Sequence, residues 1–389
     1  MNRFLIFFLF ALFVIYTNCQ NKPEYQTEEI YNVEVISIKK TSANQWDFND
    51  FFEVEKCIIL DSRIIIGDIN KIIFHDGHIF ILDTKQKAVF KFSYEGELKE
   101  RYFSFGKGPK EYTDITDFTI DKEGGDVIML DGVVGKELIK YDNKGNFIKK
   151  YKIPFGSANF HQLDEGYIFY CGNHRSSENG LNDNYFYNIV VTDEKFNVID
   201  KMAPISSIWD GRRYIFKNIT AFSQYGNSVF FQMPMPNDNT IFEVKDNSVQ
   251  PKYRFDFGND KLANLLQESK SLKEIISKID ESSLAHNLNG YFENEKIIYF
   301  AILKGDVVQQ IVYDKSDKKV FYRDLSLDQL QNFFMPTEYY GDGTFLIHIL
   351  LPFMVSGHEL ESYLPESIGT NDINNGSSIL VFVKIKDLN

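Results

Sequence analysis

Cysteine, proline and tryptophan are scarce in this chain, and their scarcity excludes several kinds of protein. The 389 residues include 3 Cys, 10 Pro and 2 Trp. With so few cysteines and no Cys-x-x-Cys pair, the sequence offers no thiolate-based metal site. Basic residues are outnumbered by acidic ones, 42 to 55, which gives a formal charge of −13. We therefore expect no nucleic-acid partner, because binding to duplexes depends on clustered cations that neutralise phosphates.

Phosphate-binding motifs are also missing, although one segment contains their residue types. FGKGPKEYTDITDFTID, residues 105–121, has two glycines close to lysines. A Walker-type loop needs G-x-x-x-x-G-K-[ST], and this segment has neither that spacing nor a following helix, while Glu111 stands where G-x-G-x-x-G needs its last glycine. We interpret the segment as a rigid bend in which Gly106 and Gly108 supply unusual backbone angles and Pro109 fixes φ.

The N-terminus has the features of an export signal. Arg3 precedes an unbroken apolar run over residues 4–16, and Cys19 follows shortly after it. The run is shorter than the roughly 20 residues that a membrane-spanning helix needs, but it is typical of a signal peptide. A cysteine at this junction resembles a bacterial lipobox. We therefore predict a signal peptide over residues 1–18 and a lipid on Cys19 that anchors the protein to a membrane. Cleavage of an ordinary signal peptide, which leaves a free thiol, is the alternative.

Internal repeats organise the rest of the chain. The clearest copies are residues 68–102 and 117–153, and each reads as four short strands separated by tight turns such as HDG, KEGG and NKG. The abundance of aromatic residues, 36 Phe and 22 Tyr, also favours strands. Looser copies continue to the C-terminus and make six units, of which the last lacks its outermost strand. An N-terminal strand at residues 31–38 or 53–60 would complete that unit and close a ring without free sheet edges.

These repeats predict an all-β fold, a six-bladed β-propeller of four-stranded antiparallel blades. We assign residues 51–389 to the propeller and residues 19–50 to a lipidated tether that can include the ring-closing strand. Residues 259–283 break the repeat, because their apolar side chains recur at helical spacing between the fourth and fifth units. We predict a helical insertion packed on the ring there, with a mobile lid as the alternative. Cys57 and Cys171 lie in separate apolar runs, which favours free thiols over a disulfide.

Loop lengths separate the two faces of the predicted ring. The turns between the first and second strands of each unit are short and share one face. The long loops share the opposite face, and long loops in a compact ring are typical of binding sites. From the long loops we select candidate residues with cationic side chains, an aromatic ring or an imidazole, because such groups suit a carboxylate or an acidic sugar. They are His174, Arg175, Trp209, Arg212, Arg213 and His358. Arginines paired with local acids such as Asp210 are the alternative interpretation.

The bend also carries a family resemblance. FGKGPKEYTDITDFTID resembles the G-x-G-P-G-E-Y…I-x-D-F signature of the six-bladed β-propeller lipoproteins common in Bacteroidota, and SSILVFVKIK is similar to their closing strand. The residues that form this structural loop motif are Gly106, Gly108, Pro109, Glu111, Tyr112 and Asp117. Lys110 departs from the usual glycine of the signature. Glu111 and Asp117 are expected to accept hydrogen bonds from N–H groups of the loop.

The resemblance implies an NHL-like propeller that is lipid-anchored in the cell envelope, and it implies no established reaction. After Cys19, the residues QNKPEY lack the acid-rich stretch that resembles a surface-export signal in this group, which favours the periplasmic side over the cell surface. The partners that we expect are the membrane, through the lipid, and a peptide, glycan or envelope protein.

We therefore expect a binding or scaffolding module that uses the face of the long loops, with no cofactor and no catalytic residue. A purely structural envelope protein is a further possibility. The enzyme alternative is a lactonase- or lyase-like propeller that holds a divalent cation such as Ca²⁺ in its central tunnel. The residues that start inner strands and would reach such a cation are Asp68, Asp117, Asn218 and Asn287.

Overall fold

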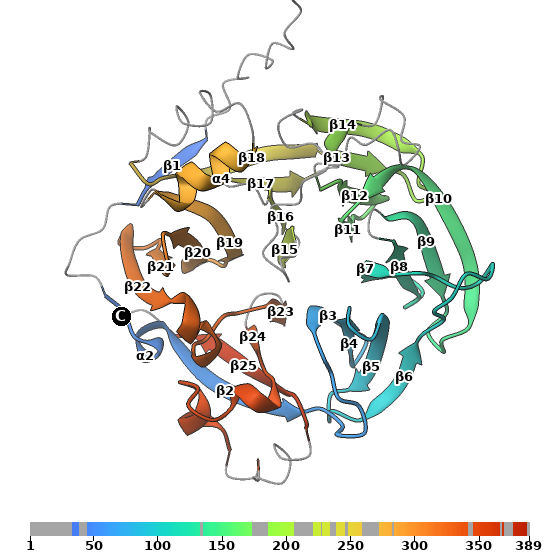
Figure 1. Ribbon diagram of the computed structural model, residues 1–389, viewed down its shortest axis with the longest axis horizontal. Helices are drawn as coiled ribbons and strands as arrows, with labels where there is room; N and C mark the ends of the chain where they lie inside the picture. The colour runs from blue at the N-terminus through green and yellow to red at the C-terminus, as the bar shows by residue number, and fades with distance from the viewer. Residues whose placement is uncertain are drawn as a thin grey trace, which may run out of the picture. The chain divides into compact units, whose positions relative to one another are not determined.

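Short antiparallel strands joined by tight turns make up most of the structure, which is a computed structural model. The residues that it describes are 33–38, 45–132, 135–172, 186–205, 221–226, 228–233, 239–245, 248–258, 272–281, 284–340, 345–365, 368 and 376–386. Val35–Asn389 forms one unit. Within this unit six sheets surround a central axis, as Figure 1 shows. The predicted six-bladed β-propeller of four-stranded antiparallel blades is confirmed.

In the first three blades the strands follow one another along the chain, and the first strand of each lies nearest the axis. Blade one consists of β3 (Ile69–His75), β4 (His78–Asp83), β5 (Ala88–Ser93) and β6 (Leu98–Tyr102). Blade two consists of β7 (Ile115–Ile120), β8 (Val127–Asp131), β9 (Gly135–Tyr141) and β10 (Phe147–Ser157). Blade three consists of β11 (Asn159–Gln162), β12 (Tyr167–Tyr170), β13 (Tyr187–Thr192) and β14 (Val198–Pro204).

The other three blades include the two N-terminal strands. Blade four consists of β15 (Phe222–Tyr225), β16 (Ser228–Gln232), β17 (Thr240–Lys245) and β18 (Ser248–Asp256), with β1 (Glu34–Ser37) at its outer edge. Blade five consists of β19 (Ala285–Glu293), β20 (Ile297–Lys304), β21 (Val307–Asp314) and β22 (Lys319–Ser326). Blade six consists of β23 (Glu338–Tyr340), β24 (Phe345–Leu350), β25 (Ile379–Ile385) and β2 (Phe52–Ile59). Short helices are α2 (Phe48–Phe51), α4 (Leu272–Asp280), η4 (Leu327–Asn332), η5 (Pro352–Met354) and η6 (Glu361–Tyr363).

The ring is closed by β2, the second of the two N-terminal candidates. It pairs antiparallel with the C-terminal strand β25, so that Phe52 lies opposite Ile385 and Ile59 lies opposite Ile379. The first candidate, β1, instead extends blade four, and the Ile38 N–H continues this pairing by donating to the Asp256 carbonyl at 2.7 Å. Closure therefore pairs the two ends of the propeller and covers the edge of β25, giving blade six its fourth strand.

The turn after β5 locks the end of the closing strand. The Gly96 carbonyl accepts a hydrogen bond from the Asp61 N–H at 2.9 Å, just beyond β2. Gly96 has φ +83, and a Cβ added there would overlap the backbone carbonyl oxygen of Ile59. Only glycine therefore allows blade one to contact the closing strand in this way.

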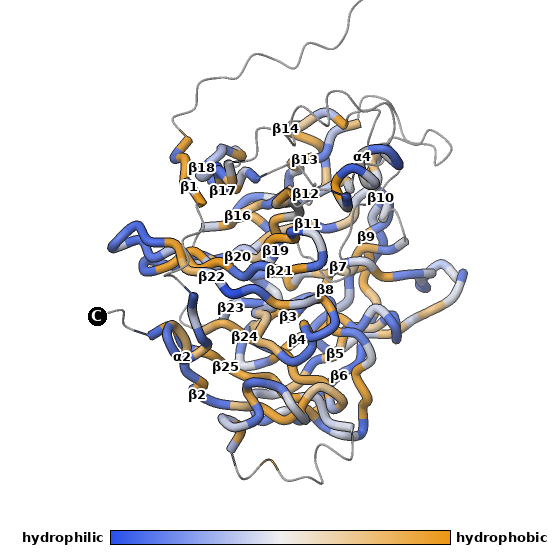
Figure 2. Tube along the Cα trace, turned by 60° about the vertical axis from the view of Figure 1, so that its left-hand side comes forward, coloured by the Kyte–Doolittle hydropathy of each residue, from blue (hydrophilic) through white to orange (hydrophobic). Residues whose placement is uncertain are grey.

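Apolar side chains fill the spaces between neighbouring blades. Phe80 and Val89 of blade one, for example, share a buried cluster with Phe118 and Met129 of blade two. Figure 2 shows hydrophobic residues along the strands and hydrophilic residues at many of the turns. Residues 45–50, which the sequence placed in the tether, also contribute to this packing, since Trp46 is buried in the cluster of the last blade.

A buried carboxylate joins blades four, five and six. Glu293, at the end of β19, is 4% exposed. Its carboxylate accepts hydrogen bonds from Lys315 at 2.6 Å and from the Tyr291 hydroxyl at 2.6 Å, and Lys252 of β18 lies 3.3 Å away. The Tyr339 hydroxyl of β23 donates to the Glu293 carbonyl at 2.9 Å. The charge of Glu293 is thus fully paired, as burial requires.

The predicted insertion is described in part. Residues 272–280 form α4 between β18 and β19, and Ile279 is fully buried. Residues 259–271 lie outside the described residues, so the helical insertion as a whole stays a prediction. Cys57 and Cys171 are free thiols, as the sequence favours. Among the described residues no helix has the length and apolar character needed to cross a membrane.

Candidate functional site

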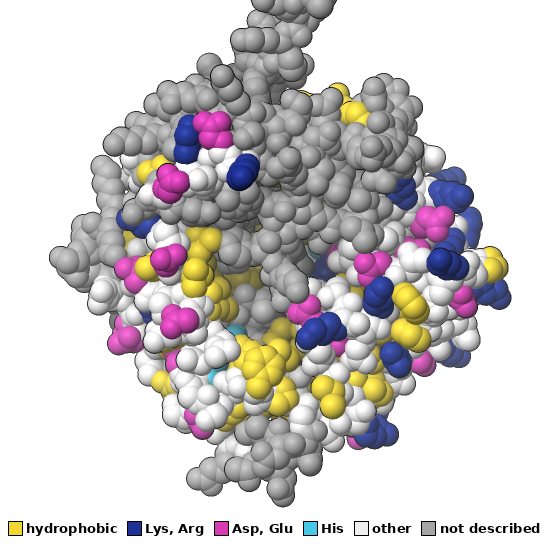
Figure 3. All heavy atoms as spheres, viewed as in Figure 1, with side chains coloured by type: hydrophobic (Ala, Val, Ile, Leu, Met, Phe, Trp, Pro, Cys, Tyr) yellow, Lys and Arg dark blue, Asp and Glu magenta, His cyan; other side chains and the backbone are white. Residues whose placement is uncertain are grey.

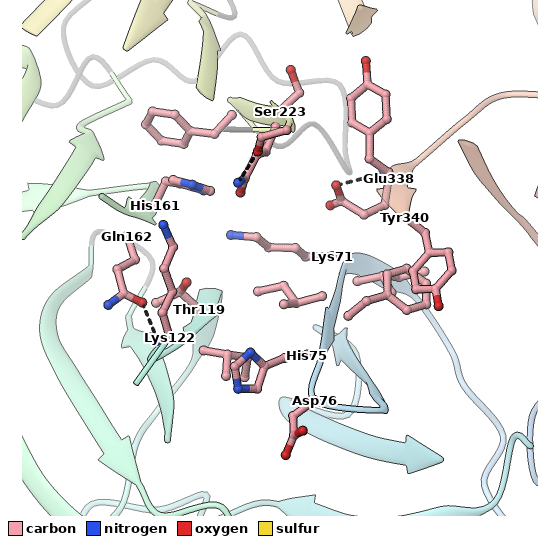
Figure 4. Close-up of a pocket in the computed structure, with 18 of the residues that line it drawn as sticks. Lys71, His75, Asp76, Thr119, Lys122, His161, Gln162, Ser223, Glu338 and Tyr340 are labelled. Atoms are coloured by element: carbon pink, nitrogen blue, oxygen red, sulfur yellow. Dashed lines mark hydrogen bonds between the residues drawn. The ribbon is translucent and has the colours of Figure 1, made fainter. Parts of the chain in front are cut away.

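The inner strands enclose a cavity of about 350 Å³ on the axis, which we call the axial pocket. Its walls are residues of β3, β7, β11, β15 and β23, together with Tyr94 after β5 and residues of the turns that follow β3, β7 and β15. Those turns join first and second strands, so the pocket lies at the face of the short turns and not at the face for which the sequence predicts the long loops. Figure 4 shows polar side chains converging on it from several blades. The principal polar ones are Lys71, Thr119, Lys122, His161, Ser223 and Glu338.

Two residues at equivalent places in the first two blades form an ion pair at the pocket. Lys71 lies opposite Leu82 in blade one, and Asp117 lies opposite Leu130 in blade two. Equivalent positions of neighbouring inner strands approach each other at the axis, and the Lys71 Nζ lies 2.9 Å from the Asp117 Oδ1. The Lys71 side chain is 9% exposed and that of Asp117 is 1% exposed. This pair therefore fixes an ammonium group in the wall of the cavity.

Asp117 positions this ammonium because its own carboxylate is held firmly. The Phe118 N–H donates to Oδ1 at 2.8 Å, and the Phe160 N–H donates to Oδ2 at 2.8 Å. The Lys71 Nζ also lies 3.4 Å from the Phe160 carbonyl oxygen. Blades one, two and three thus meet in one hydrogen-bonded group.

His161 lies next to this group and has a buried nitrogen without a partner. Its Nε2 makes no hydrogen bond within the described structure. Burial, together with the nearby charges of Lys71 and Lys122, lowers the pKa of His161 to about 3. In Figure 4 the side chains of both lysines extend toward the His161 ring. The imidazole is therefore neutral, and the hydrogen-bonding capacity of its Nε2 is unused in this structure.

Glu338 forms the opposite wall. Its Oε1 accepts a hydrogen bond from the N–H of the next residue, Tyr339, at 3.0 Å. Burial raises the pKa of Glu338 to about 7; the nearby charge of Lys71 acts in the opposite direction. The wall beside it is aromatic, since the rings of Phe74 and Tyr340 lie 4.7 Å apart. The carboxyl group is thus poised between its neutral and charged forms near neutral pH.

The cations of the pocket are distinct from those elsewhere on the surface. In Figure 3, Lys and Arg side chains gather along the rim beside β6 and β10, far from the centre of the ring. The cations that line the axial pocket are Lys71 and Lys122. Lys122 also pairs at 3.2 Å with Asp164, whose side chain is almost fully exposed, and such exposed pairs contribute little energy. Lys122 therefore keeps most of its charge available to the pocket.

Comparison with known proteins identifies the family. Residues 24–374 match the family described as "Domain of unknown function (DUF4934)". The chain belongs to this family. No curated protein matches this DUF4934 chain.

Solved structures share the fold of this DUF4934 chain. A "putative exported protein" of Bacteroides fragilis is 18% identical, with a TM-score of 0.70 over 91% of this chain and 100% of its own. A member of the DUF4221 family from Bacteroides vulgatus is 9% identical, with a TM-score of 0.50 over 87% of this chain and 99% of its own. Virginiamycin B lyase from Staphylococcus aureus reaches a TM-score of only 0.41 at 14% identity, over 76% and 81% of the two chains. At these identities the first two likenesses show the fold alone, and no conclusion is drawn from the third.

Most of the ligand residues selected from the sequence cannot be placed in the DUF4934 chain. His174, Arg175, Trp209, Arg212 and Arg213 lie outside the described residues. The surface that they were expected to form stays a prediction.

His358, the sixth selected residue, is buried. It is 3% exposed, and its Nε2 lies 3.1 Å from the Nε2 of His348, which is also 3% exposed. The Leu360 N–H donates to the His358 Nδ1 at 3.1 Å, and the His348 Nδ1 lies 2.8 Å from the Met335 carbonyl oxygen. Burial lowers the pKa of both rings, that of His348 to about 3. In this structure the pair therefore fastens the loop after β24 to the strand.

The structural loop motif forms a tight bend before β7. The Gly108 N–H donates to the Glu111 carboxylate at 2.7 Å, and a Cβ on Gly106 would overlap that carboxylate. Tyr112 is fully buried, and its hydroxyl donates to the Lys87 carbonyl. Pro109 lies within the same bend. Asp117 acts differently, because the N–H groups from which it accepts hydrogen bonds belong to the inner strands at the axis and not to the bend.

The residues proposed for a tunnel cation fit it poorly where the structure describes them. The Asp117 Oδ1 accepts hydrogen bonds from Lys71 and Phe118 and its Oδ2 accepts one from Phe160, so this carboxylate is already paired with a cation that would repel a metal ion. The Asp68 carboxylate accepts a hydrogen bond from the Thr84 hydroxyl at 3.3 Å. Across the described ranges no group of three His, Cys, Asp or Glu side chains is placed to hold a metal ion. Asn218 and the side chain of Asn287 lie outside the described residues.

Three principal residues of the pocket, Lys71, His161 and Glu338, were not among those selected from the sequence. For Lys71 the sequence signal is weak, because aligning HIFILD with DVIMLD without a gap places Lys71 at Thr119, and only the strand pairing places it at the position of Asp117. No comparable signal exists for Glu338, since EYYGDG in the last repeat has diverged too far from the other turns.

Proposed function

We propose that this DUF4934 chain is an exported binding protein of the cell envelope that takes a ligand into its axial pocket. The observation that carries the proposal is the cavity itself, with a fixed ammonium, a neutral imidazole and a titratable carboxyl in its walls. Pockets of this size that combine apolar walls with a few convergent polar groups are typical ligand sites. Export is supported by the apolar N-terminal run and by the likeness to a "putative exported protein".

The methyl groups of the pocket allow a test before the ligand is identified. Ile72, Ile73 and Ile120 line the cavity and report any occupant through their ¹H–¹³C signals. A set of anionic, cationic and neutral fragments should contain compounds that shift these signals. Ser223→Tyr, which places a ring into the cavity, should abolish those shifts while leaving the other isoleucine signals in place. Fragments that shift only methyls outside the pocket, or shifts that survive this substitution, would refute the proposed site.

The lipid anchor is the second part of the proposal. Cys19 follows the apolar run at the position that a lipobox requires, and a diacylated cysteine would hold the protein stably at a membrane. Cys19→Ala should move the protein from the membrane fraction to the soluble fraction of the envelope. A variant that stays in the membrane fraction after a carbonate wash would contradict lipidation.

The face of the long loops is proposed as the surface for a larger partner, a peptide, glycan or envelope protein. Arg212 and Arg213 are the residues to test, because two adjacent guanidinium groups suit a carboxylate. Replacing both with alanine should reduce binding on glycan and peptide arrays while leaving fragment binding in the axial pocket unchanged. Array binding that is insensitive to the double change would remove these residues from the proposal.

A further inference from the structure

We infer that the ligand of the axial pocket is an organic carboxylate with an apolar body. This inference rests on the proposed function and adds the chemical class of the ligand. It follows from the donors that the pocket leaves open, from the sign of its charges and from its apolar walls.

The ammonium of Lys71 has a donor left for a ligand. A lysine Nζ carries three N–H donors. One points to the Asp117 Oδ1 at 2.9 Å, and a weaker contact reaches the Phe160 carbonyl at 3.4 Å. The third donor has no protein acceptor within the described structure, and Lys71 lines the cavity. A carboxylate oxygen would complete its hydrogen bonds, and a charge-assisted bond of this kind is stronger than one to a neutral acceptor.

A second group of donors lies beside it. The unpartnered Nε2 of His161 and the ammonium of Lys122 belong to the same wall as Lys71. The two lysines are close enough to His161 for both charges to act on its ring. Two ammonium groups on one side of a cavity attract an anion and repel a cation, and the neutral imidazole beside them adds no opposing charge.

Glu338 is the pocket residue whose negative charge would favour a cationic ligand. It faces the cavity without an ion-pair partner among the described residues, and aromatic rings lie beside it. An amine next to it would, however, also lie near Lys71, whose charge already reaches the Glu338 carboxyl. In its neutral form Glu338 becomes a hydrogen-bond donor and no longer opposes an anion. The balance of charges therefore favours a carboxylate.

The rest of the wall suits an apolar body. Side chains of Ile72, Ile73, Phe74, Ile120 and Phe222 contribute to the lining. Apolar surface that leaves water in such a pocket adds roughly 25 cal/mol per Å². A cavity of about 350 Å³ has room for a bicyclic ring with a short acidic arm.

Three probes of nearly the same shape separate the charge classes. They are 2-naphthoate, 2-naphthalenemethanol and 2-naphthylmethylammonium, each titrated at pH 6 into the full-length protein and followed by calorimetry and by the Ile methyl signals. We expect 2-naphthoate to bind about tenfold more tightly than the alcohol, because it gains a charge-assisted hydrogen bond. The ammonium probe should bind more weakly than the alcohol.

Variants assign the effect to the pocket. Lys71→Met alone would leave Asp117 buried and unpaired, so we combine it with Asp117→Asn, which removes both charges together. This double variant should lose about tenfold in affinity for 2-naphthoate and little for the alcohol. Lys122→Met should lose about threefold. Lys144→Met, in the exposed turn after β9, is the matched control on the same face and should leave the affinity unchanged.

The outcomes separate this inference from the proposed function. If the alcohol or the ammonium probe binds at the pocket methyls as tightly as 2-naphthoate, the pocket binds ligands but the carboxylate class is wrong. If the charge-balanced double variant keeps full affinity for 2-naphthoate, Lys71 is not the anion donor and the inference fails. If 2-naphthoate does not shift the pocket methyls at millimolar concentration, the inference is overturned, while the broader fragment set still decides the proposed function. Thermal unfolding of each variant must match that of the native protein for its affinity to count.

Discussion

Binding of 2-naphthoate should weaken by about tenfold between pH 6 and pH 8. The cause is Glu338, whose pKa burial raises to about 7. A bound carboxylate and an ionised Glu338 would repel each other in a cavity with little water, so the ligand favours the neutral form of Glu338. If only that form accepts the ligand, the apparent Kd rises by a factor of about 1.1 at pH 6 and about 11 at pH 8. The probe itself stays ionised across this range, since carboxylic acids titrate near pH 4.

Other titratable groups surround Glu338 and need to be distinguished from it. Those on the elements near β23 are Lys71, His75, Asp76, Tyr94, Asp117, Lys122, His161, Tyr225 and His348. Burial lowers the pKa of His161 and of His348 to about 3, so neither changes its charge between pH 6 and pH 8. His75 also lines the cavity, and the control variant for it is His75→Gln.

Calorimetry in two buffers of different ionisation enthalpy measures the coupled proton. At pH 7 the native protein should take up about 0.5 proton for each 2-naphthoate bound, because about half of Glu338 is ionised before binding. Glu338→Gln should bind with the same affinity at pH 6 and pH 8 and take up no proton, whereas His75→Gln should keep the full pH dependence. A tenfold change that persists in Glu338→Gln would refute the role given to this carboxyl.

Three further predictions concern stability. In urea titrations, Gly96→Ala should lower the free energy of unfolding by about 3 kcal/mol, because its Cβ would overlap the Ile59 carbonyl. Gly77 also has positive φ but has open space around it, so Gly77→Ala should lower the free energy of unfolding by only about 1 kcal/mol. Glu293→Gln should cost about 3 kcal/mol in the same assay, because it removes the buried counter-charge of Lys315 and leaves Lys252 with Glu243 alone. The pKa of His348 is lower in the folded protein than the ordinary value near 6.5, so the unfolded chain binds more protons and stability falls as the pH drops below about 6.5. The share of His348 in this loss should reach about 2 kcal/mol at pH 5, and His348→Phe should remove that share while keeping the share of His161.

Each of these results has a clear contrary outcome. If the two glycine substitutions lower the free energy of unfolding equally, the turn after β5 does not pack tightly against the closing strand. A Glu293→Gln protein as stable as the native one would show that the carboxylate adds nothing to the contact between blades. An identical acid profile in native protein and His348→Phe would mean that other groups set the loss of stability.

The architecture was predictable because its signals are local. Turns such as HDG and KEGG place the first two blades within a few residues of their true bounds, and the residues between them alternate as strands do. The identity of the closing strand was not predictable. Residues 31–38 and 53–60 alternate equally well, and the choice depends on the distant strands that each one meets, β18 and β25.

The axial pocket was only partly visible in the sequence. Asp117 was noticed at the start of an inner strand, but its partner Lys71 becomes evident only from the strand pairing, in which Lys71 lies opposite Leu82 and Asp117 lies opposite Leu130. Glu338 and His161 acquire their properties from burial by neighbouring blades, which no local pattern encodes. His358 shows that a loop position can also mislead. It lies in a long loop, which suggests an exposed side chain, but its ring is buried against His348.

A crystal structure of the protein soaked with 2-naphthoate at pH 6 would decide where the ligand lies. We predict density for the naphthyl ring against the apolar wall of the axial pocket, with a carboxylate oxygen about 3 Å from the Lys71 Nζ and within reach of His161. Density for the probe among the long loops, or a ring inverted so that its carboxylate points away from Lys71, would contradict this assignment.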